Sequence, residues 1–369
     1  MPQVNKISRI VIASVLKPVD ETRMFAKIGT ALAQAGHEVH IIGFPTQHTK
    51  PDPAVKFHPI ANQAFSRLSL TRLLTPFKAL RIALQVRPDY LIITTHELLF
   101  MAWWCKLITG CKVIYDVQEN YYRNIRFTNA FPAGMRIVLA CWVRLKERLL
   151  HPIIHVYLLA EKGYQQELRF AKPHIILQNK ITRVMAGQFK KEKHTGYSRL
   201  LFSGTLAETT GVFHAIQLAE ELHNLDNNIH LTLIGHCTSH TTHLQLLELA
   251  RQKSCIDYRG SEHPVPHKTI LKAVGQADFG IVWYPPNPST ACSIPTKLFE
   301  YLGLNLAILV SHTPETEQLV QQQGAGIILA QPVDYQKLLM NMKTFSLPQE
   351  RQHSYFDEDV LALVEALGK

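Results

Sequence analysis

Short apolar runs alternate with stretches of helical spacing along the first half of the chain. Continuous runs rich in β-branched residues predict strands, and apolar residues three or four positions apart predict helices. The predicted strands cover residues 9–16, 39–42, 90–94, 113–116, 153–159 and 175–177. The predicted helices cover residues 23–35, 96–108, 132–150 and 164–170. Strands that are apolar throughout, with helices between them, are typical of a parallel sheet covered on both faces.

The same alternation returns in the second half, after a break rich in glycine and lysine at 186–199. Predicted strands there cover residues 200–203, 229–234, 256–258, 279–283 and 307–311. Predicted helices cover residues 212–222, 244–253, 269–276, a segment around Glu300, 335–345 and 360–367. We therefore predict an α/β fold of two doubly wound, Rossmann-like domains facing across a cleft. The predicted division is an N-terminal domain at 1–185, a linker at 186–199, a C-terminal domain at 200–350 and a helix at 351–369 that packs back on the N-terminal domain.

Ligands of doubly wound sheets bind beyond the carboxyl ends of the strands. In the second half, the loops at 203–205, 235–236, 260 and 285–296 all follow predicted strands. We expect these loops to converge on one edge of the sheet.

Charge is distributed unevenly along the 369 residues, whose formal net charge is +10. Residues 1–178 carry 23 Lys and Arg against 11 Asp and Glu, whereas residues 179–369 carry 16 against 18. The first half is therefore expected to face an anionic partner such as a membrane surface or a lipid phosphate. Nucleic acid is not an expected partner, because no nucleic-acid-binding motif accompanies the charge.

A basic amphipathic stretch at 65–86 places Arg67, Arg72, Lys78 and Arg81 among leucines and contains no acid. Such a stretch can lie on an anionic membrane; a core-packed helix with a solvated basic face is the alternative. No run of 18 apolar residues and no secretory signal is visible. We expect a cytoplasmic protein that is peripheral on the inner face of the membrane.

The six cysteines include no Cys-x-x-Cys pair. Their spacing predicts neither a zinc site nor a disulfide framework, and reduced thiols are the expectation. We expect no metal site.

The stretch from Ser293 to Tyr301 reads Ser-Ile-Pro-Thr-Lys-Leu-Phe-Glu-Tyr and lies between two predicted strands. Pro295 suits the first turn of a helix, where its missing N–H is not needed. The free N–H groups of that turn, with Lys297 beside them, form an anion site. Glu300 lies about one turn further on and can face the same ligand. A nucleotide-sugar requires such a phosphate site beside a carboxylate that accepts sugar hydroxyls; an ordinary capped helix is the alternative.

Several further segments carry a resemblance through their order and spacing. They are residues 17–23 with 36–39, the Tyr-Asp-Val-Gln-Glu-Asn segment at 115–120, Leu-Gln-Asn at 177–179, Ser-Gly-Thr-Leu at 203–206 with Gly211, and Glu315 with 324–326. Together they resemble the GT-B glycosyltransferases, specifically the large retaining family often called family four. The resemblance covers nearly the whole chain.

The resemblance implies that the C-terminal domain binds the donor, a UDP- or GDP-type nucleotide-sugar, as a co-substrate and without a further cofactor. Glu300 would hold the ribose hydroxyls, and the loop with the first turn of the helix would hold the diphosphate. The implied donor-binding residues are Gly204, Thr205, His236, Tyr258, Ser293, Ile294, Pro295, Thr296, Lys297 and Glu300. The N-terminal domain would face a glycan or lipid-linked acceptor, and transfer would retain configuration without a metal.

Three candidate catalytic residues, His96, Asp116 and Glu119, follow strands of the first half. Either carboxylate could accept the proton of the acceptor hydroxyl; structural pairing with a nearby arginine is the alternative. His96 could contact the acceptor or the donor sugar, or it could simply start a solvated helix. Asp20 and Arg23 are candidates for the cleft, with Arg23 on phosphate; a capped helix start is the alternative.

The chain departs from the family pattern at several positions. Cys292 stands where the first of two family glutamates is usual, Gln118 stands for a histidine, and no Arg–Lys pair follows Gly204. The leading hypothesis is a hexosyl-type glycosyltransferase that builds a cell-envelope polysaccharide precursor. The alternatives are a catalytically degenerate partner or scaffold subunit and a nucleotide-sugar epimerase of the same fold.

Overall fold

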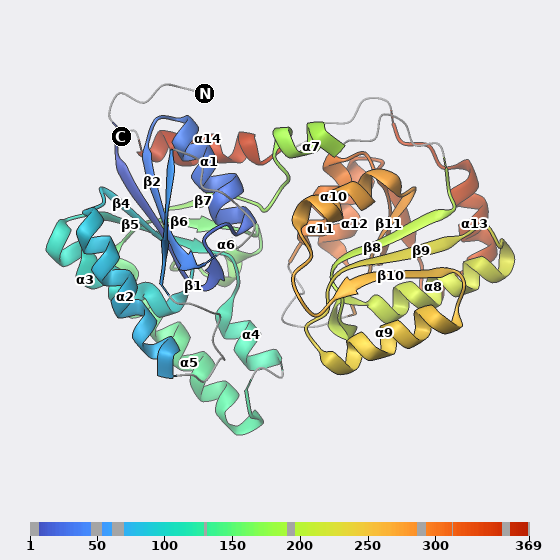
Figure 1. Ribbon diagram of the computed structural model, residues 1–369, viewed down its shortest axis with the longest axis horizontal. Coiled ribbons are helices and arrows are strands. Elements are labelled where there is room, and N and C mark those ends of the chain that lie inside the picture. Colours follow the sequence, from blue (N-terminus) through green and yellow to red (C-terminus); the bar gives the residue numbers. More distant parts are fainter. Residues whose placement is uncertain are drawn as a thin grey trace. The chain divides into compact units, whose positions relative to one another are not determined.

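Two compact units make up the protein in the computed structural model (Figure 1). One unit contains Met1–Asn179 and Phe356–Lys369, and the other contains Lys180–Tyr355. The structure describes residues 7–45, 54–60, 70–128, 131–189, 196–285, 293–311, 313–348 and 355–367.

The first unit is built on a seven-stranded sheet of order β3-β2-β1-β4-β5-β6-β7, in which every neighbouring pair is parallel. Its strands are β1 (Arg9–Pro18), β2 (Glu38–Phe44), β3 (Val55–Pro59), β4 (Tyr90–Ile93), β5 (Lys112–Val117), β6 (Ile154–Leu159) and β7 (His174–Ile176). Its helices are the π-helical segment η1 (Thr22–Gly29), α1 (Thr30–Gln34), α2 (Leu70–Val86), η2 (His96–Leu98), α3 (Leu99–Thr109), α4 (Tyr121–Phe127), α5 (Ala133–Leu149), η3 (His151–Ile153), α6 (Tyr164–Glu167) and α14 (Phe356–Leu367).

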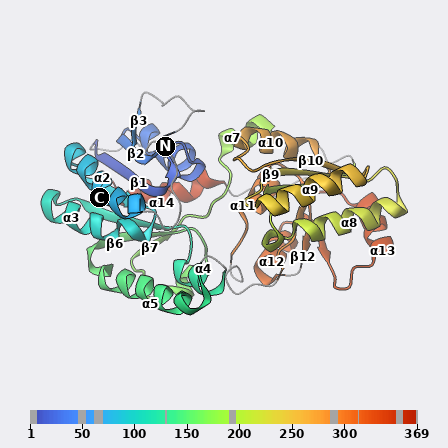
Figure 2. The same cartoon turned by 60° about the horizontal axis from the view of Figure 1, so that its bottom comes forward.

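Both faces of this sheet are covered, as its apolar strands require. On one face, η1, α1 and α14 pack against alternate residues of the strands, including Ile10 and Ile12. On the other face, α2 and α3 pack against the intervening residues, including Val11 and Ala13. Figures 1 and 2 show α2 and α3 side by side on their face.

The second unit is built on a six-stranded parallel sheet of order β10-β9-β8-β11-β12-β13. Its strands are β8 (Arg199–Thr205), β9 (His230–His236), β10 (Ile256–Ser261), β11 (Phe279–Val282), β12 (Ala307–Ser311) and β13 (Gly326–Leu329). Its helices are α7 (Arg183–Phe189), η4 (Glu208–Thr210), α8 (Val212–Leu225), α9 (His240–Gln252), α10 (His267–Gln276), α11 (Thr296–Gly303), α12 (Pro314–Gln322) and α13 (Tyr335–Thr344). Helices α8, α9 and α13 cover one face, and α7, α10, α11 and α12 cover the other.

The strand order of the second sheet reverses between β8 and β11, which are neighbours although they are far apart in the chain. Such a switch point opens a crevice at the carboxyl ends of the two strands, where ligands of open α/β sheets bind. Strands β8 and β11 both end there.

The predicted fold class, two doubly wound α/β units, is confirmed. The predicted α-helix at 23–35 is in part a π-helix, and β3, α4, α12 and β13 had no counterpart in the prediction. The division between units falls at Asn179 and α7 occupies the start of the predicted linker, because Ile181 and Ala186 pack into the core of the second unit. Of that linker, 190–195 lie outside the described residues.

Helix α14 completes the core of the first unit. Phe356, Val360 and Leu363 are buried there, and the Tyr90 hydroxyl donates a 2.9 Å hydrogen bond to the carbonyl of Leu367. Within the described ranges, no helix has both the length and the apolar character needed to cross a bilayer.

Candidate functional site

A buried lysine lies at the switch point of the second sheet. Lys297, in the first turn of α11, is only 6% exposed, and its Nζ has no hydrogen-bond partner among the described residues. Nζ lies 3.5 Å from the centroid of the Phe202 ring and 5.6 Å from that of Tyr284. Burial lowers the pKa of Lys297 to about 7. An ammonium held this way is costly unless an anion joins it.

Gly204, at the end of β8, opens the backbone in front of this lysine. Its φ of +96° lies in the left-handed region, and a Cβ placed there would come within 4 Å of one heavy atom only, Cε of Lys297 at 3.9 Å. Any other residue would be strained and would fill the space over the ammonium. Glycine at this position therefore keeps the space between the backbone of residue 204 and the Lys297 side chain free of a side chain of its own.

The N-terminus of α11 faces the same part of the sheet. Pro295 takes the N-cap position with φ −59° and ψ 138°, one residue before the helix rather than inside its first turn. The early N–H groups of a helix carry a partial positive charge. The positive charge of Lys297 and the partial positive charge of this helix end therefore both favour an anion at the same place.

Glu300 lies one turn after Lys297 and is 7% exposed. Its Oε1 lies 2.7 Å from Nε2 of His267, the first residue of α10. The Lys297 pKa is raised somewhat by the Glu300 charge, although burial dominates. His267 thus orients one carboxylate oxygen of Glu300 and leaves the other for a further donor.

Sequence reasoning missed His267. It lies 33 residues from Glu300, and no short motif links the two positions. The available signal was its place after Pro266 at a helix start, which many structural residues share.

The remaining candidates of the second unit lie on strands β8 to β10 and at the entry to α11. Thr205 accepts a hydrogen bond from the Thr210 hydroxyl at 2.7 Å, and His236 contacts the Glu262 carbonyl at 3.0 Å. The Tyr258 hydroxyl lies 2.6 Å from Nδ1 of His243, and burial raises its pKa to about 12. Ser293, Ile294 and Thr296 are half-buried where the chain enters α11.

In the first unit, Arg23 and Asp116 pair with each other. Arg23 Nε and Nη2 donate to the two carboxylate oxygens at 2.9 and 2.7 Å, and both side chains are buried. Gln118 Nε2 donates to Asp116 at 2.7 Å. This arrangement favours the structural pairing over a phosphate contact for Arg23 or a base role for Asp116.

The start of η1 is capped by Glu21, whose carboxylate lies 3.0 and 2.9 Å from two backbone nitrogens. Asp20 is half-buried beside it.

His96 follows β4 and lies in a buried charged cluster. Lys146 Nζ lies 2.9 Å from His96 Nδ1, and burial lowers the pKa of His96 to about 4 and that of Lys146 to about 8. Because an ammonium only donates, Nδ1 accepts and Nε2 keeps the ring proton. In this state His96 is a neutral hydrogen-bond donor. Its neighbour Glu97 pairs with Arg72.

Glu119, after β5, is exposed and accepts a 2.8 Å hydrogen bond from Asn124. Its carboxylate is therefore open to solvent, in contrast to that of Asp116. Across the ranges that the structure describes, no group of three or more His, Cys, Asp or Glu is arranged to hold a metal ion.

Comparisons with known proteins give matches in structure but not in sequence. No family model matches the chain, and no curated protein matches it. Sucrose-phosphate synthase from Thermosynechococcus elongatus superposes with a TM-score of 0.65 at 12% identity, covering 98% of this chain and 95% of that one.

Two further solved structures show the same likeness. HepE from Anabaena, in complex with UDP and glucose, gives a TM-score of 0.59 at 12% identity and covers 97% and 95% of the two chains. A provisionally assigned UDP-N-acetylglucosamine 2-epimerase from Listeria monocytogenes gives 0.61 at 10% identity and covers 98% and 97%. Likeness over nearly the full length of both chains shows that this protein has the GT-B fold.

Proposed function

We propose that this protein is a glycosyltransferase that moves a sugar from a nucleotide-diphosphate-sugar to a glycan or lipid-linked acceptor. One observation carries the proposal: the buried ammonium of Lys297, at the switch point of a GT-B donor-type sheet, has no partner among the residues that the structure describes. A diphosphate is the anion that this place suits, because a glycine backbone and a helix N-terminus face the same space. Solved neighbours with this fold include an Anabaena protein that holds UDP and glucose.

In this proposal, the diphosphate lies against Lys297, the backbone of Gly204 and the first turn of α11. Glu300 accepts the ribose hydroxyls with its free oxygen, while His267 holds the other oxygen at 2.7 Å. Ser293 to Thr296 shape the entry to the helix, and His236 and Tyr258 lie further along the edge toward the base.

The loop after β8 explains why so much depends on one lysine. From Thr205 to Val212 the chain has no Lys or Arg, and Leu206 is fully buried. Cys292, which stands in place of a family glutamate, lies outside the described residues. Charge-assisted contacts to phosphate are among the strongest hydrogen bonds available. The number of cationic side chains at the site therefore limits the affinity for the diphosphate. We expect weak donor binding compared with a site that has three cations.

The finer features of the reaction remain part of the proposal. We propose UDP or GDP as the nucleotide, a hexose-type sugar, retention of configuration, and no metal or other cofactor. The product would be a cell-envelope polysaccharide precursor made on the cytoplasmic face of a membrane. Of the basic stretch at 65–86, residues 65–69 lie outside the described part of the chain, and Arg72 is turned inward to Glu97.

Two other functions have an observation in their favour. The likeness to the Listeria structure named for epimerisation favours an epimerase, which would convert a nucleotide-sugar without an acceptor. The missing cations after β8 favour a degenerate subunit, which would bind no nucleotide at all. Incubating the protein with UDP-N-acetylglucosamine alone distinguishes an epimerase from a transferase, because only the epimerase would convert the nucleotide-sugar without an acceptor.

Thermal unfolding with UDP, GDP, ADP, CMP and dTDP tests the proposal. A ligand at 100 times its dissociation constant stabilises a fold by about 2.7 kcal/mol, which raises the midpoint by several degrees. We expect one diphosphate to give this shift, Glu300→Ala to abolish it, and the exposed-site control Glu248→Ala to keep it. Absence of a shift with every nucleotide would favour the degenerate subunit.

A further inference from the structure

Helix α5 presents most of its large apolar side chains to solvent, while Arg144, Lys146 and Glu147 turn toward the protein. Along the helix, six large hydrophobic residues are between 48% and 69% exposed: Met135, Ile137, Val138, Trp142, Leu145 and Leu149. Five of them follow each other at intervals of three or four residues and so form one stripe. We call this set the α5 stripe. On a helix that packs on a globular core, such a stripe would normally face inward.

The inward face of α5 holds Ala140 and Val143, which pack against Ile125 of α4, together with charged side chains that have fixed partners. Lys146 is 6% exposed and lies 2.9 Å from His96, and Arg144 donates to Asn120 at 2.8 Å. Glu147 is 5% exposed, 3.3 Å from both Arg144 and the Tyr115 hydroxyl. Turning the helix to bury its stripe would break all of these contacts. The orientation of the stripe is therefore built into the fold.

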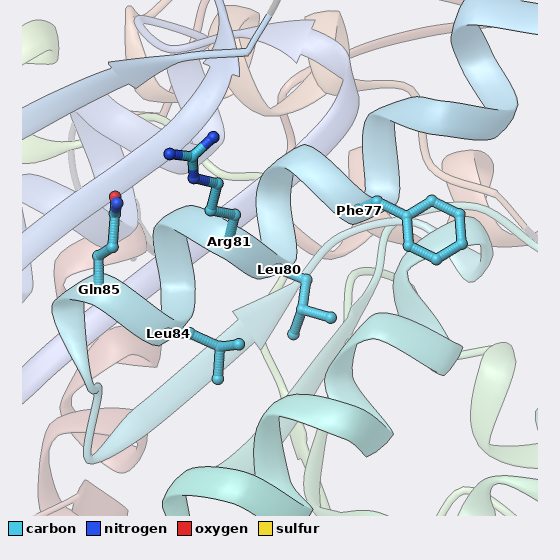
Figure 3. Close-up of a pocket in the computed structure, with 5 residues that line it drawn as sticks. All are labelled: Phe77, Leu80, Arg81, Leu84 and Gln85. Carbon is cyan, nitrogen blue, oxygen red and sulfur yellow. The ribbon is translucent and has the colours of Figure 1, made fainter.

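Helix α3 also exposes large apolar side chains. Phe100, Trp104, Leu107 and Ile108 are between 46% and 62% exposed, at spacings of four, three and one. Next to it, α2 has an open pocket of about 370 Å³ in which Leu80, Leu84 and Phe77 lie with Arg81 and Gln85 (Figure 3). Phe77, Leu80 and Leu84 add further apolar side chains on the neighbouring helix.

Charge distinguishes the possible occupants of this surface. Of the eight Lys and Arg on helices α2, α3 and α5, Lys78, Arg81 and Arg148 are exposed, whereas the only acid of these helices is the buried Glu147. The three helices also hold three of the four tryptophans of the chain, Trp103, Trp104 and Trp142. A second copy of the chain would place like charges against each other. An anionic bilayer complements them, and tryptophan is favoured at its interface.

We propose that the α5 stripe, together with the exposed side chains of α3, inserts into the interface of an anionic phospholipid bilayer, with α5 lying in the membrane plane. The surface differs from the basic stretch at 65–86 because apolar insertion, and not charge alone, makes the contact. The proposal does not depend on the donor site or on sugar transfer.

Co-sedimentation of the full chain with vesicles of phosphatidylcholine containing 30% phosphatidylglycerol tests it. The matched variants are Val138→Glu/Leu145→Glu on α5 and Val184→Glu/Leu244→Glu on the second unit, since the paired positions have similar exposure, 69% against 65% and 48% against 52%. We expect the wild type and the control to bind, the α5 variant to bind at least about tenfold more weakly, and all binding to weaken with salt.

A second measurement guards against misfolding of the charged variant. Brominated lipids should quench tryptophan emission in the wild type and much less in Trp104→Phe/Trp142→Phe, a conservative change. Equal losses in the α5 and control variants, or no quenching, would overturn the proposal. So would a dimer in lipid-free solution that Val138→Glu/Leu145→Glu dissociates without any effect on vesicle binding. The nucleotide-induced thermal shift reports on the donor site independently in every variant.

Discussion

The two units leave different groups without a partner. Among the described residues, the first unit exposes fifteen large hydrophobic side chains and the second exposes four. Arg23, buried in the first unit, pairs with Asp116, whereas Lys297, buried in the second, has no partner in the described part of the chain. The first unit thus leaves apolar surface uncovered, and the second leaves a buried cation without an anion.

The largest expected effect tests whether the buried charges of the first unit are structural. Asp116→Ala leaves the Arg23 guanidinium buried and unpaired, which we expect to lower the free energy of unfolding by about 3–5 kcal/mol. Urea unfolding measures the loss. Asp257→Ala removes an exposed partner of Arg259 and should cost less than about 0.5 kcal/mol. A loss below about 1 kcal/mol for Asp116→Ala would contradict a structural role.

Replacing the unpaired ammonium should separate function from stability in the second unit. Lys297→Met should weaken nucleotide-diphosphate binding about 100-fold, because a charge-assisted contact disappears. The same change should raise the free energy of unfolding by about 1 kcal/mol at pH 6, because a buried charge disappears. Calorimetric titration and urea unfolding give the two numbers. The exposed-site control Lys272→Met should change neither.

The pH dependence of binding sharpens the same contrast. The Lys297 pKa of about 7 lies below its usual 10.5, since burial disfavours the cation. Above pH 7, binding of a diphosphate therefore requires Lys297 to take up a proton from solution. The affinity for the diphosphate should fall by up to about tenfold per pH unit. In Lys297→Met the profile should be flat between pH 7 and 8.5. A wild-type profile that is equally flat would contradict the lowered pKa.

The stability of the free protein should change in the opposite direction. Between pH 7 and 10.5 the unfolded chain keeps a proton on Lys297 that the folded chain has lost. The contribution of this group to the free energy of unfolding therefore rises with pH across that window, and its destabilising effect is complete below pH 7. The difference in the free energy of unfolding between wild type and Lys297→Met should therefore narrow as the pH rises from 7 to 10.5.

The smallest expected effect concerns His267. His267→Ala should weaken nucleotide binding by about three- to tenfold, because Glu300 loses the donor that orients it. His267→Gln, which keeps a donor, should recover part of the loss. His263→Ala, an exposed histidine nearby, is the control. Equal affinity in His267→Ala and wild type would show that Glu300 needs no such support.

Much of this contrast could be predicted from the sequence, because periodicity reports burial. The apolar runs predicted most strands, and the spacing of Pro295, Lys297 and Glu300 predicted the helix that carries them. The unequal charge of the two halves likewise indicated an anionic partner for the first unit. These patterns depend only on residues that are close together in the sequence, so they can be recognised without knowledge of tertiary contacts.

The rest depends on contacts between distant residues. His267 meets Glu300 across 33 residues, and Arg23 meets Asp116 across 93, so no spacing could link them. The α5 stripe shows a subtler limit. The sequence predicts a helix at 132–150, but only the partners of Lys146 and Arg144 determine which face turns inward.

The return of the chain to the first unit has a consequence for its synthesis. The second unit, Lys180–Tyr355, is continuous, whereas the first needs both the start of the chain and Phe356–Leu367, which buries Val360 and Leu363 in the core. On the ribosome, the second unit can fold as soon as it emerges, whereas the first unit must wait until Phe356–Leu367 has been made. Nascent chains should therefore acquire protease resistance in the order opposite to that in which they are translated.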